Sequence, residues 1–461
     1  MSLGTMAYAL LQSAVVPALS DIEHSLHTTE TGVAWVLTAY LLSASVATPV
    51  IGRLGDMYGK ERLLLLSYLL LVGGTLMAAL VNSIGLLVVA RVVQGVGGGV
   101  FPLSFGIIRD EFPPARIAGA IGLLSAIFGT GAGAGIVVGG LIVEHLSWHW
   151  LFWIPLVALV GAAYLTGRFV PESPIRTPGA INWLNALLMG GGLTAVLLAI
   201  SEATVWGWGS AKTVGLLVGG LVLCGVWVLA ELRSPAPLVD MAMMRLRGVW
   251  TTNLAGFLLG AGMFASFVIV PQFVETPASA GYGFGASVLA GSVYLVPTTA
   301  AMLVLGALAG RAAARFGSKA ALLAGATLSA AGFGLLTAAH SRPWHIYVAM
   351  ALLGAGIGLA FAAMGNLIVG AVPAGQTGVA TGMNTVMRTV GGAAGSQIAA
   401  TMIAGHLLAG GLPAEHGYVL AFAISFAFLA VCVLASVLVP GRSASQGIPE
   451  AATAALVAAP E

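Results

Sequence analysis

Gly52-Arg53-Leu54-Gly55-Asp56-Met57-Tyr58-Gly59-Lys60-Glu61-Arg62 separates two long apolar runs, at 32–51 and 63–81. Each run has about the 20 residues that a helix needs to cross the hydrocarbon core of a bilayer. The glycines permit a tight turn, and the basic groups favour the cytoplasmic surface of a membrane. The stretch therefore predicts a short cytoplasmic loop between two membrane-spanning helices.

A second stretch, Gly310-Arg311-Ala312-Ala313-Ala314-Arg315-Phe316-Gly317-Ser318, repeats the first in register with glycine, arginine, an aromatic residue and a second glycine. Both copies follow apolar runs at corresponding positions, so the first six spans pair with the last six. Copies on the same side of the membrane indicate parallel repeats about an axis along the membrane normal, as in the two halves of some transporters. Chance similarity between short loops is the alternative.

The composition agrees with a membrane as the main solvent. Of the 461 residues, 59% are hydrophobic and 7% are charged, whereas a soluble domain carries roughly 25% charged residues. The first run starts at Leu3 without a preceding basic region, so we interpret it as a span rather than a cleaved signal peptide. We predict an all-α membrane protein with fourteen spans, at 3–20, 32–51, 63–81, 85–108, 117–142, 150–170, 181–201, 213–231, 248–271, 286–310, 319–339, 345–370, 377–407 and 417–439.

Most basic residues fall on one side of the predicted membrane. If the N-terminus is cytoplasmic, Lys212 and Arg342 lie outside, while Arg91 and Arg388 lie within spans. The other fourteen lie on the cytoplasmic side: Arg53, Lys60, Arg62, Arg109, Arg116, Arg168, Arg176, Arg233, Arg245, Arg247, Arg311, Arg315, Lys319 and Arg442. This bias follows the positive-inside rule, and the loss of one span would invert every later loop. It favours both termini in the cytoplasm of a bacterial inner membrane.

The repeat divides the chain into four predicted parts. They are an N-terminal six-helix bundle at 1–170, an inserted helical pair with its loops at 171–247, a C-terminal six-helix bundle at 248–440 and a cytoplasmic tail at 441–461.

Several other classes of protein are disfavoured. Cys224 and Cys432 lie in apolar stretches without the spacing of a metal or disulfide site. The glycines at 95–99 lack the lysine that ends a phosphate-binding loop, and we find no zinc motif or acyl-transfer triad. The net charge of +2 does not indicate nucleic acid binding. We predict neither enzymatic activity nor a metal or cofactor.

The stretch at 52–62 resembles motif A of the major facilitator superfamily, G-x-L-a-D-r-x-G-r-k, at its expected place between the second and third spans. The resemblance implies two six-helix bundles that rock about a central cavity. It also implies that Arg53 and Asp56 join a charge network that locks the cytoplasmic face, with Arg62 and Asp110 as further members. Such pairs can be made in one conformation and broken in another.

The residues at 87–102, LVVARVVQGVGGGVFP, resemble motif B of the same family. Arg91 lies roughly 9 Å into its predicted span by helix rise. A charge at that depth normally faces a cavity or a partner, so we expect Arg91, with Gln94 nearby, on the substrate or proton path. Snorkelling of Arg91 to the outer surface is the alternative.

The residues at 129–140, GTGAGAGIVVGG, resemble motif C, the glycine motif of family antiporters. The resemblance implies a conformational role for Gly131, Gly133, Gly135, Gly139 and Gly140. The family pattern has Gly-Pro where this chain has Gly135-Ile136, so the match is partial. Close packing of the glycines without bending is the alternative.

Three further strings look like the fourteen-span drug/proton antiporter branch. They are WVLTAYL at 35–41, WHWLFW at 148–153 and GMNTVMRTVGGAAG at 382–395, which places Arg388 on the same path. The chain departs from many proton-coupled members because AYALLQSAVVP at 7–17 contains no acid. Glu144 and Glu202, near span ends, are our candidates for proton coupling. A solvated acid at a span end is the alternative for each.

The resemblance implies that spans 1, 2, 4, 5, 9, 10, 12 and 13 line the cavity. Our candidate substrate contacts are aromatic or uncharged polar residues: Tyr8, Gln12, Tyr40, Phe105, Asn253, Phe257, Phe264, Tyr294, Phe361 and Asn384. A lining that is poor in charge suits lipophilic compounds better than sugars or phosphorylated solutes. Any single aromatic could instead face lipid.

These features predict a monomeric carrier that exports lipophilic or cationic organic compounds in exchange for protons by alternating access. A proton-independent facilitator and a dedicated exporter of one metabolite are alternatives within transport. A membrane sensor or channel is an alternative of another class.

Overall fold

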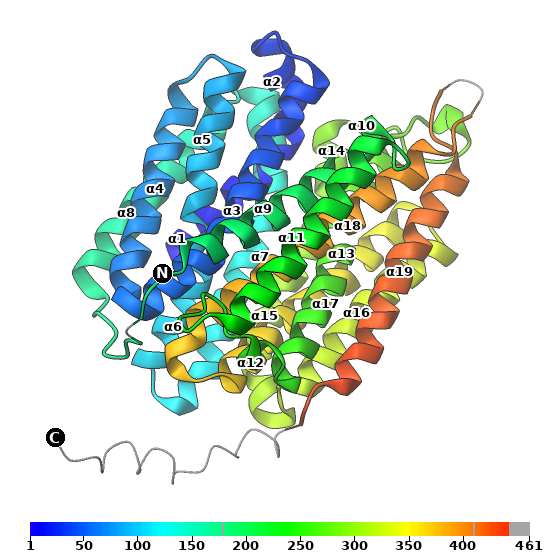
Figure 1. Cartoon of the computed structure of the whole chain (residues 1–461). Coiled ribbons are helices and arrows are strands. Elements are labelled where there is room, and N and C mark those ends of the chain that lie inside the picture. Colours follow the sequence, from blue (N-terminus) through cyan, green and yellow to red (C-terminus); the bar gives the residue numbers. More distant parts are fainter. Residues whose placement is uncertain (178, 409–410, 442–461) are drawn as a thin grey trace, which may run out of the picture.

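The computed structural model describes residues 1–177, 179–408 and 411–441, and helices account for most of them (Figure 1). Leu407 and Pro413 form an isolated antiparallel bridge near the last helix. Arg442 and the rest of the predicted tail after Gly441 lie outside the described residues. The all-α fold that the sequence predicts is confirmed.

The N-terminal group of helices ends at Phe169. It contains α1 (Ser2–Ser13), α2 (Leu19–Ser25), α3 (Glu30–Tyr58), α4 (Lys60–Leu80), α5 (Ile84–Val96), α6 (Val100–Glu111), α7 (Pro114–His145) and α8 (Trp150–Phe169). The fourth predicted span is broken into α5 and α6 by a short 3-10 turn at Gly97–Gly99. Three successive glycines favour such a break because they lack side chains to support the α-helix.

The second half of the chain contains two groups of helices. The insert comprises α9 (Trp183–Ser201), α10 (Ala203–Trp206), α11 (Ala211–Arg233) and α12 (Met241–Met244). The C-terminal group comprises α13 (Arg247–Glu275), α14 (Val288–Val293), α15 (Val296–Phe316), α16 (Ser318–Ala338), α17 (Pro343–Ala371), α18 (Thr377–Ala404) and α19 (Glu415–Leu438).

Thirteen helical stretches among the described residues are long and apolar enough to cross a membrane. The other predicted span, at 377–407, corresponds to α18, which has 28 residues but many threonines, glycines and other polar residues. Its length suffices for a crossing, and its polarity suits a helix that faces the interior of the protein. The count of fourteen crossings stays a prediction.

The two related loops are shorter than predicted. α3 continues through Tyr58, and the chain turns at Gly59, with φ of 121°. α15 likewise continues through Phe316 and turns at Gly317, with φ of 89°. A residue with a side chain rarely adopts such φ values, which explains why both copies of the repeat place glycine there.

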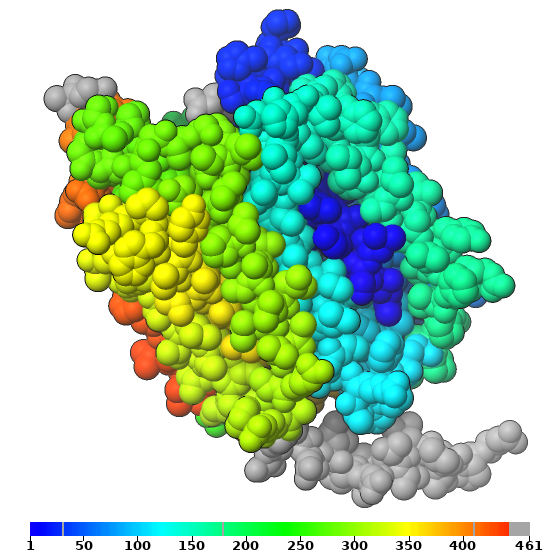
Figure 2. All heavy atoms as spheres, turned by 180° about the vertical axis from the view of Figure 1, so that it is seen from behind, coloured from blue at the N-terminus to red at the C-terminus, as the bar shows by residue number. Residues whose placement is uncertain are grey.

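The N-terminal and C-terminal groups meet along two seams. α7 packs along α15 and α17, while α3 and α6 pack along α18. α9 and α11 pack on each other in front of these seams, and α9 touches both α3 and α18 (Figure 1). From behind, the blue-to-cyan N-terminal group and the green-to-yellow C-terminal group lie side by side (Figure 2).

The outer faces of the helices are apolar and exposed. Val157 and Tyr164 on α8, Leu69 on α4 and Leu221 on α11 all leave more than half of their side chains uncovered. Such broad apolar exposure is unusual for a protein in water and suits a surface that contacts lipid.

Candidate functional site

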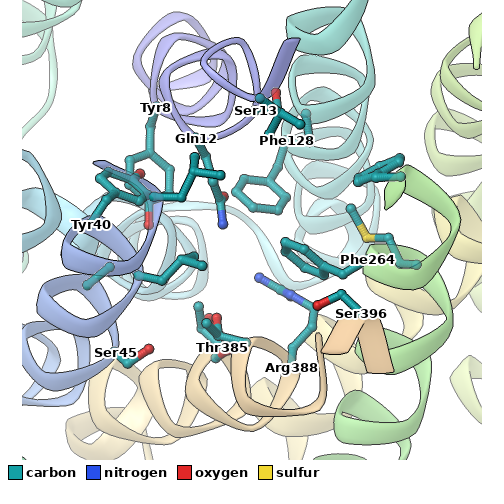
Figure 3. Close-up of a pocket in the computed structure, with 18 of the residues that line it drawn as sticks. Tyr8, Gln12, Ser13, Tyr40, Ser45, Phe128, Phe264, Thr385, Arg388 and Ser396 are labelled. Carbon is teal, nitrogen blue, oxygen red and sulfur yellow. Dashed lines mark hydrogen bonds between the residues drawn. The ribbon is translucent and has the colours of Figure 1, made fainter. Parts of the chain in front are cut away.

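A cavity of about 190 Å³ lies between the two groups of helices. α1, α3 and α7 line it from the N-terminal side, and α13 and α18 line it from the C-terminal side (Figure 3). Its lining is largely apolar, with hydroxyls, one amide and one guanidinium. The lining residues are Tyr8, Gln12, Ser13, Val16, Leu37, Tyr40, Leu41, Ala44, Ser45, Thr48, Phe128, Ala132, Ile136, Met263, Phe264, Phe267, Val268, Thr385, Val386, Arg388, Thr389 and Ser396.

Four of the ten predicted substrate contacts line this cavity: Tyr8, Gln12, Tyr40 and Phe264. The other six lie outside its lining. Asn384 donates to Asn253 Oδ1 at 3.0 Å, and the rings of Tyr294 and Tyr347 stack at 4.7 Å between centroids. Phe105 packs on Phe101, Phe257 packs on α18 at Gly391, and Phe361 packs on the guanidinium of Arg388.

The prediction missed a polar face of α18. Thr381, Thr385 and Thr389 recur every four residues, and each hydroxyl donates to the carbonyl four residues earlier, at 2.7–3.0 Å. Thr385 and Thr389 line the cavity beside Arg388. The four-residue spacing of hydroxyls around an intramembrane arginine was the signal available in the sequence, because residues four apart share one helix face.

Asp56 joins the two groups of helices on one side of this cavity. Its two carboxylate oxygens accept hydrogen bonds from the backbone N–H groups of Gly378 and Val379, at 3.2 and 3.1 Å. These N–H groups belong to the first turn of α18, where a helix has free donors and a partial positive charge. Gly52 packs so closely on Gly378 that a Cβ there would lie 2.5 Å from the Gly378 oxygen.

Two of the four predicted members of the gating network meet through a residue that was not among the candidates. Lys60 Nζ lies 2.5 Å from Asp110 Oδ2 and 3.7 Å from Asp56 Oδ1, and all three side chains are fully buried. Arg62 instead pairs with Glu172 at 3.6 Å on the exposed surface. Arg53 forms no ion pair within the described part of the chain. Arg109 adds a bond across the seam, donating to Thr377 Oγ1 at 2.7 Å.

The segment after α8 crosses this closure. Ser173 Oγ donates to Asp110 Oδ2 at 2.5 Å, and the Thr177 N–H donates to the Asp56 carbonyl at 2.8 Å. The Thr177 hydroxyl donates to the carbonyl of Gly375 at 3.1 Å, on the C-terminal side of the seam. The linker therefore bonds to both groups of helices where they meet.

Arg91 lies behind the cavity rather than in its lining. It is fully buried and donates to the carbonyls of Val36 and Leu11 at 2.9 and 3.1 Å and to Gln94 Oε1 at 2.7 Å. Its guanidinium also stacks 4.2 Å from the centroid of Tyr40, whose ring lines the cavity. Snorkelling to the surface is excluded by this burial.

Arg388, in contrast, lines the cavity. Its guanidinium carbon lies 4.5 Å from the ring centroid of Phe361, 5.2 Å from that of Phe128 and 5.3 Å from that of Phe101. No acidic residue within the described residues forms an ion pair with it. The side chain points into the cavity, opposite Gln12 (Figure 3).

Neither predicted proton-coupling acid lines the cavity. Glu144 is exposed near the end of α7. Glu202 follows α9, has 4% of its surface exposed, and burial raises the pKa of its carboxyl group. Glu231 accepts hydrogen bonds from the Trp227 indole and the Leu238 N–H, at 3.0 and 2.9 Å, which indicates a structural role. No cluster of metal-binding side chains occurs among the residues that the structure describes.

The glycines of 129–140 pack α7 against two neighbours. A Cβ at Gly131, Gly135 or Gly139 would collide with α1 or the turn after it, the last at 2.3 Å from the Ala14 carbonyl. Gly133 and Gly140 instead face Thr299 and Ser292 of the C-terminal group. Because α7 is one continuous helix from Pro114 to His145, these contacts support the packing interpretation of the glycines.

Sequence comparison identifies related proteins over most of the chain. A model described as Major Facilitator Superfamily matches residues 1–396. An uncharacterised MFS-type transporter of Mycobacterium tuberculosis is 30% identical over 398 residues, or 85% of this chain and 57% of that protein. The tetracenomycin C resistance and export protein of Streptomyces glaucescens is 28% identical over 409 residues, which are 87% of this chain and 74% of that protein. The chain thus spans little more than half the length of the mycobacterial relative.

Solved structures share the fold at low sequence identity. The human organic anion transporter MFSD10 (TETRAN) has a TM-score of 0.64 at 17% identity, covering 93% of this chain and 97% of that one. The proton:xylose symporter XylE has a TM-score of 0.67 at 14% identity, and the match covers 95% of this chain and 94% of that one.

Proposed function

This chain belongs to the major facilitator superfamily, and from that premise we propose that it is a proton-coupled exporter of lipophilic organic compounds that works by alternating access. It is an integral membrane protein, and proteins of this family are carriers of small organic substrates rather than enzymes. The proposal adds the direction, the coupling ion and the substrate class.

One observation carries the proposal. The cavity lies between two groups of helices and is closed on one side by bonds that cross between those groups. A bond from Asp56 to the first turn of α18 can break when the groups rock apart, which would open that side while the other closes. Alternating access requires a bistable closure of this kind.

The lining supports lipophilic substrates. Phe128, Phe264, Phe267 and Met263 supply apolar contact, whereas sugars need a dense set of hydrogen-bonding groups. Export agrees with the name of the tetracenomycin C resistance and export protein. A multidrug transporter of Bacillus subtilis is 26% identical over 365 residues, which are 78% of this chain and 66% of that protein. Cationic substrates fit less well, because the guanidinium of Arg388 faces the cavity.

In this proposal the chain works as a monomer in the bacterial inner membrane, with both termini in the cytoplasm. The two rocking bodies are residues 1–170 and 248–440, and residues 171–247 form an insert. The gate is Asp56, Lys60 and Asp110, near the basic loops that favour the cytoplasmic surface.

Proton coupling requires a carboxylate that gains and loses a proton near the working pH. We assign it to Glu202 rather than Glu144, because a buried carboxylate with a raised pKa can exchange protons closer to neutral pH. A proton-independent facilitator is the second candidate function, and the absence of acids from the cavity lining favours it.

Transport by purified protein in proteoliposomes tests both functions. We would measure uptake of a neutral fluorescent aromatic probe with and without an imposed pH gradient. Thr389→Trp fills the cavity and should abolish uptake, whereas Val157→Trp, on the lipid-facing side of α8, is the matched control.

The results of this assay distinguish proton-coupled transport from facilitated transport and test whether the cavity binds the substrate. Uptake that the gradient accelerates supports proton coupling, and uptake that ignores the gradient supports the facilitator. Uptake that survives Thr389→Trp would contradict the assignment of the cavity. If the wild-type protein moves no neutral probe in either direction, the proposed transport of neutral lipophilic compounds is wrong, and the transport of charged analogues of the same aromatic body then tests the transport function.

A further inference from the structure

The cavity carries one fixed charge, and that charge is positive. Among its lining residues, Arg388 is the only ionisable group that is charged at neutral pH, and no aspartate or glutamate is present. The other polar groups are uncharged: the amide of Gln12 and the hydroxyls of Tyr8, Ser13, Tyr40, Ser45, Thr48, Thr385, Thr389 and Ser396.

Arg388 lies deep in the protein without an anionic partner. It is the twelfth residue of α18, and only 5% of its surface is exposed. Among the described residues, none forms an ion pair with it or accepts a hydrogen bond from its guanidinium. A buried charge in a membrane protein is costly and normally marks a functional site, because otherwise a neutral residue would be more stable there.

Three aromatic rings hold the guanidinium in place. The rings of Phe361, Phe128 and Phe101 lie 4.5–5.3 Å from its central carbon. Cation–π contacts of this kind stabilise a cation without neutralising it. The ring carbons accept no hydrogen bonds from the guanidinium. Its N–H donors therefore remain available to bind an anion in the cavity.

The rest of the cavity suits the body of an organic anion. Gln12 and Arg388 point into it from opposite groups of helices, with the rings of Phe128 and Phe264 beside them (Figure 3). A planar guanidinium binds a carboxylate through two parallel hydrogen bonds. Aromatic walls would stack on an aromatic or other flat apolar body.

We propose that the substrates of this carrier are amphipathic organic anions, with a carboxylate or another oxyanion on an aromatic body, and that Arg388 recognises their charge. This inference rests on the proposed transport function. Bound between Gln12 of α1 and Arg388 of α18, such an anion contacts both moving groups, so its charge can bias their relative position.

The test compares three probes that share one aromatic body. They are naphthalene-2-sulfonate, its neutral sulfonamide and the corresponding trimethylammonium, and counterflow in proteoliposomes measures their transport. We expect the wild-type protein to prefer the anion over the cation by at least about tenfold, which corresponds to about 1.4 kcal/mol. Equal transport of anion and cation would overturn the inference but leave the transport function intact. Failure to transport all three would instead contradict the transport function.

Variants then assign the preference to Arg388. Arg388→Gln should remove the anion preference, and Arg388→Lys should retain part of it as a point charge. If Arg388→Gln does not fold, Thr385→Asp leaves the arginine in place and puts a carboxylate one turn away, where it can pair with the guanidinium.

Thr385→Asn has the same shape as Thr385→Asp without the charge, so the difference between these two variants isolates the electrostatic effect. We expect Thr385→Asp to lower anion transport relative to Thr385→Asn by about tenfold, and to lower cation transport much less. An anion preference that survives both Arg388→Gln and Thr385→Asp would refute the role of Arg388.

Discussion

Arg91 and Arg388 are both buried inside membrane-spanning helices, yet their surroundings differ. Arg91 makes three hydrogen bonds to its own group of helices and stacks on Tyr40. Arg388 faces the cavity with aromatic rings around it and no ion-pair partner among the described residues. Depth in the membrane therefore does not assign a role to an arginine, whereas the hydrogen bonds that its guanidinium makes to neighbouring helices do.

This difference predicts opposite consequences for stability and transport. Arg91 joins α1, α3 and α5 through three hydrogen bonds, so its removal should destabilise the protein strongly. The guanidinium of Arg388 makes neither a hydrogen bond nor an ion pair to the described residues, so it contributes little to folding, and its removal should change what the protein transports. Four substitutions test this contrast, in order of decreasing effect on stability.

Arg91→Ala should have the largest effect. It removes hydrogen bonds from a charged donor and leaves a hole among α1, α3 and α5, so we expect a loss of at least about 3 kcal/mol. Thermal unfolding of detergent-solubilised protein, followed by size-exclusion fluorescence, measures the change. A variant that unfolds at the wild-type temperature would show that Arg91 is not structural.

Gln94→Ala should have the next effect. Gln94 accepts from Arg91 Nη1 at 2.7 Å and donates to Thr75 Oγ1 at 3.0 Å, so its loss removes two buried hydrogen bonds, although Arg91 Nη1 keeps its bond to the Leu11 carbonyl. We expect a cost of about 2 kcal/mol in the same unfolding assay. Because the two residues share one hydrogen bond, the double variant should cost less than the two single costs added together. Strict additivity would contradict the shared network.

The arrangement of the helices followed closely from the sequence, for a physical reason. Apolar length and the positive-inside bias are local properties, and the glycines at 59 and 317 mark turns that require positive φ. The loops were predicted too long because Arg53 and Asp56 are polar, although the helix continues through both. Polar residues in a sequence show where a helix leaves the hydrocarbon of the membrane. The residue at which the helix itself ends depends instead on packing with the rest of the protein.

The site was less predictable because its contacts join distant segments. Asp56 caps a helix that begins at Thr377, and no periodicity in the chain reveals that pairing. We predicted both Arg91 and Arg388 on the transport path, because a single sequence shows how deep a residue lies in the membrane. It does not show which face of the helix meets the cavity. The threonines at 381, 385 and 389 were a readable sign of that face.

Phe361→Leu should have a smaller effect than Gln94→Ala. It removes the nearest ring over Arg388 and keeps an apolar side chain of reduced size, so we expect a cost of about 1 kcal/mol. A double-mutant cycle with Arg388→Met isolates the cation–π contact from the packing. We expect a coupling of about 0.5–1 kcal/mol between the two positions. A coupling energy near zero would show that the ring of Phe361 does not stabilise the guanidinium of Arg388.

Arg388→Met should have the smallest effect on stability and so gives the sharpest contrast with Arg91. Methionine is unbranched and flexible enough to occupy the space of the arginine stem. The loss of the cation–π contacts destabilises the protein, while the removal of an unpaired buried charge stabilises it, so these contributions oppose each other. We expect a net change within about 1 kcal/mol, of either sign, in the same unfolding assay, whereas Arg91→Met, as the matched control, should unfold well below the wild-type temperature. If Arg388→Met is destabilised as strongly as Arg91→Met, the guanidinium of Arg388 holds the helices together, and the distinction between a structural and a recognising arginine is lost.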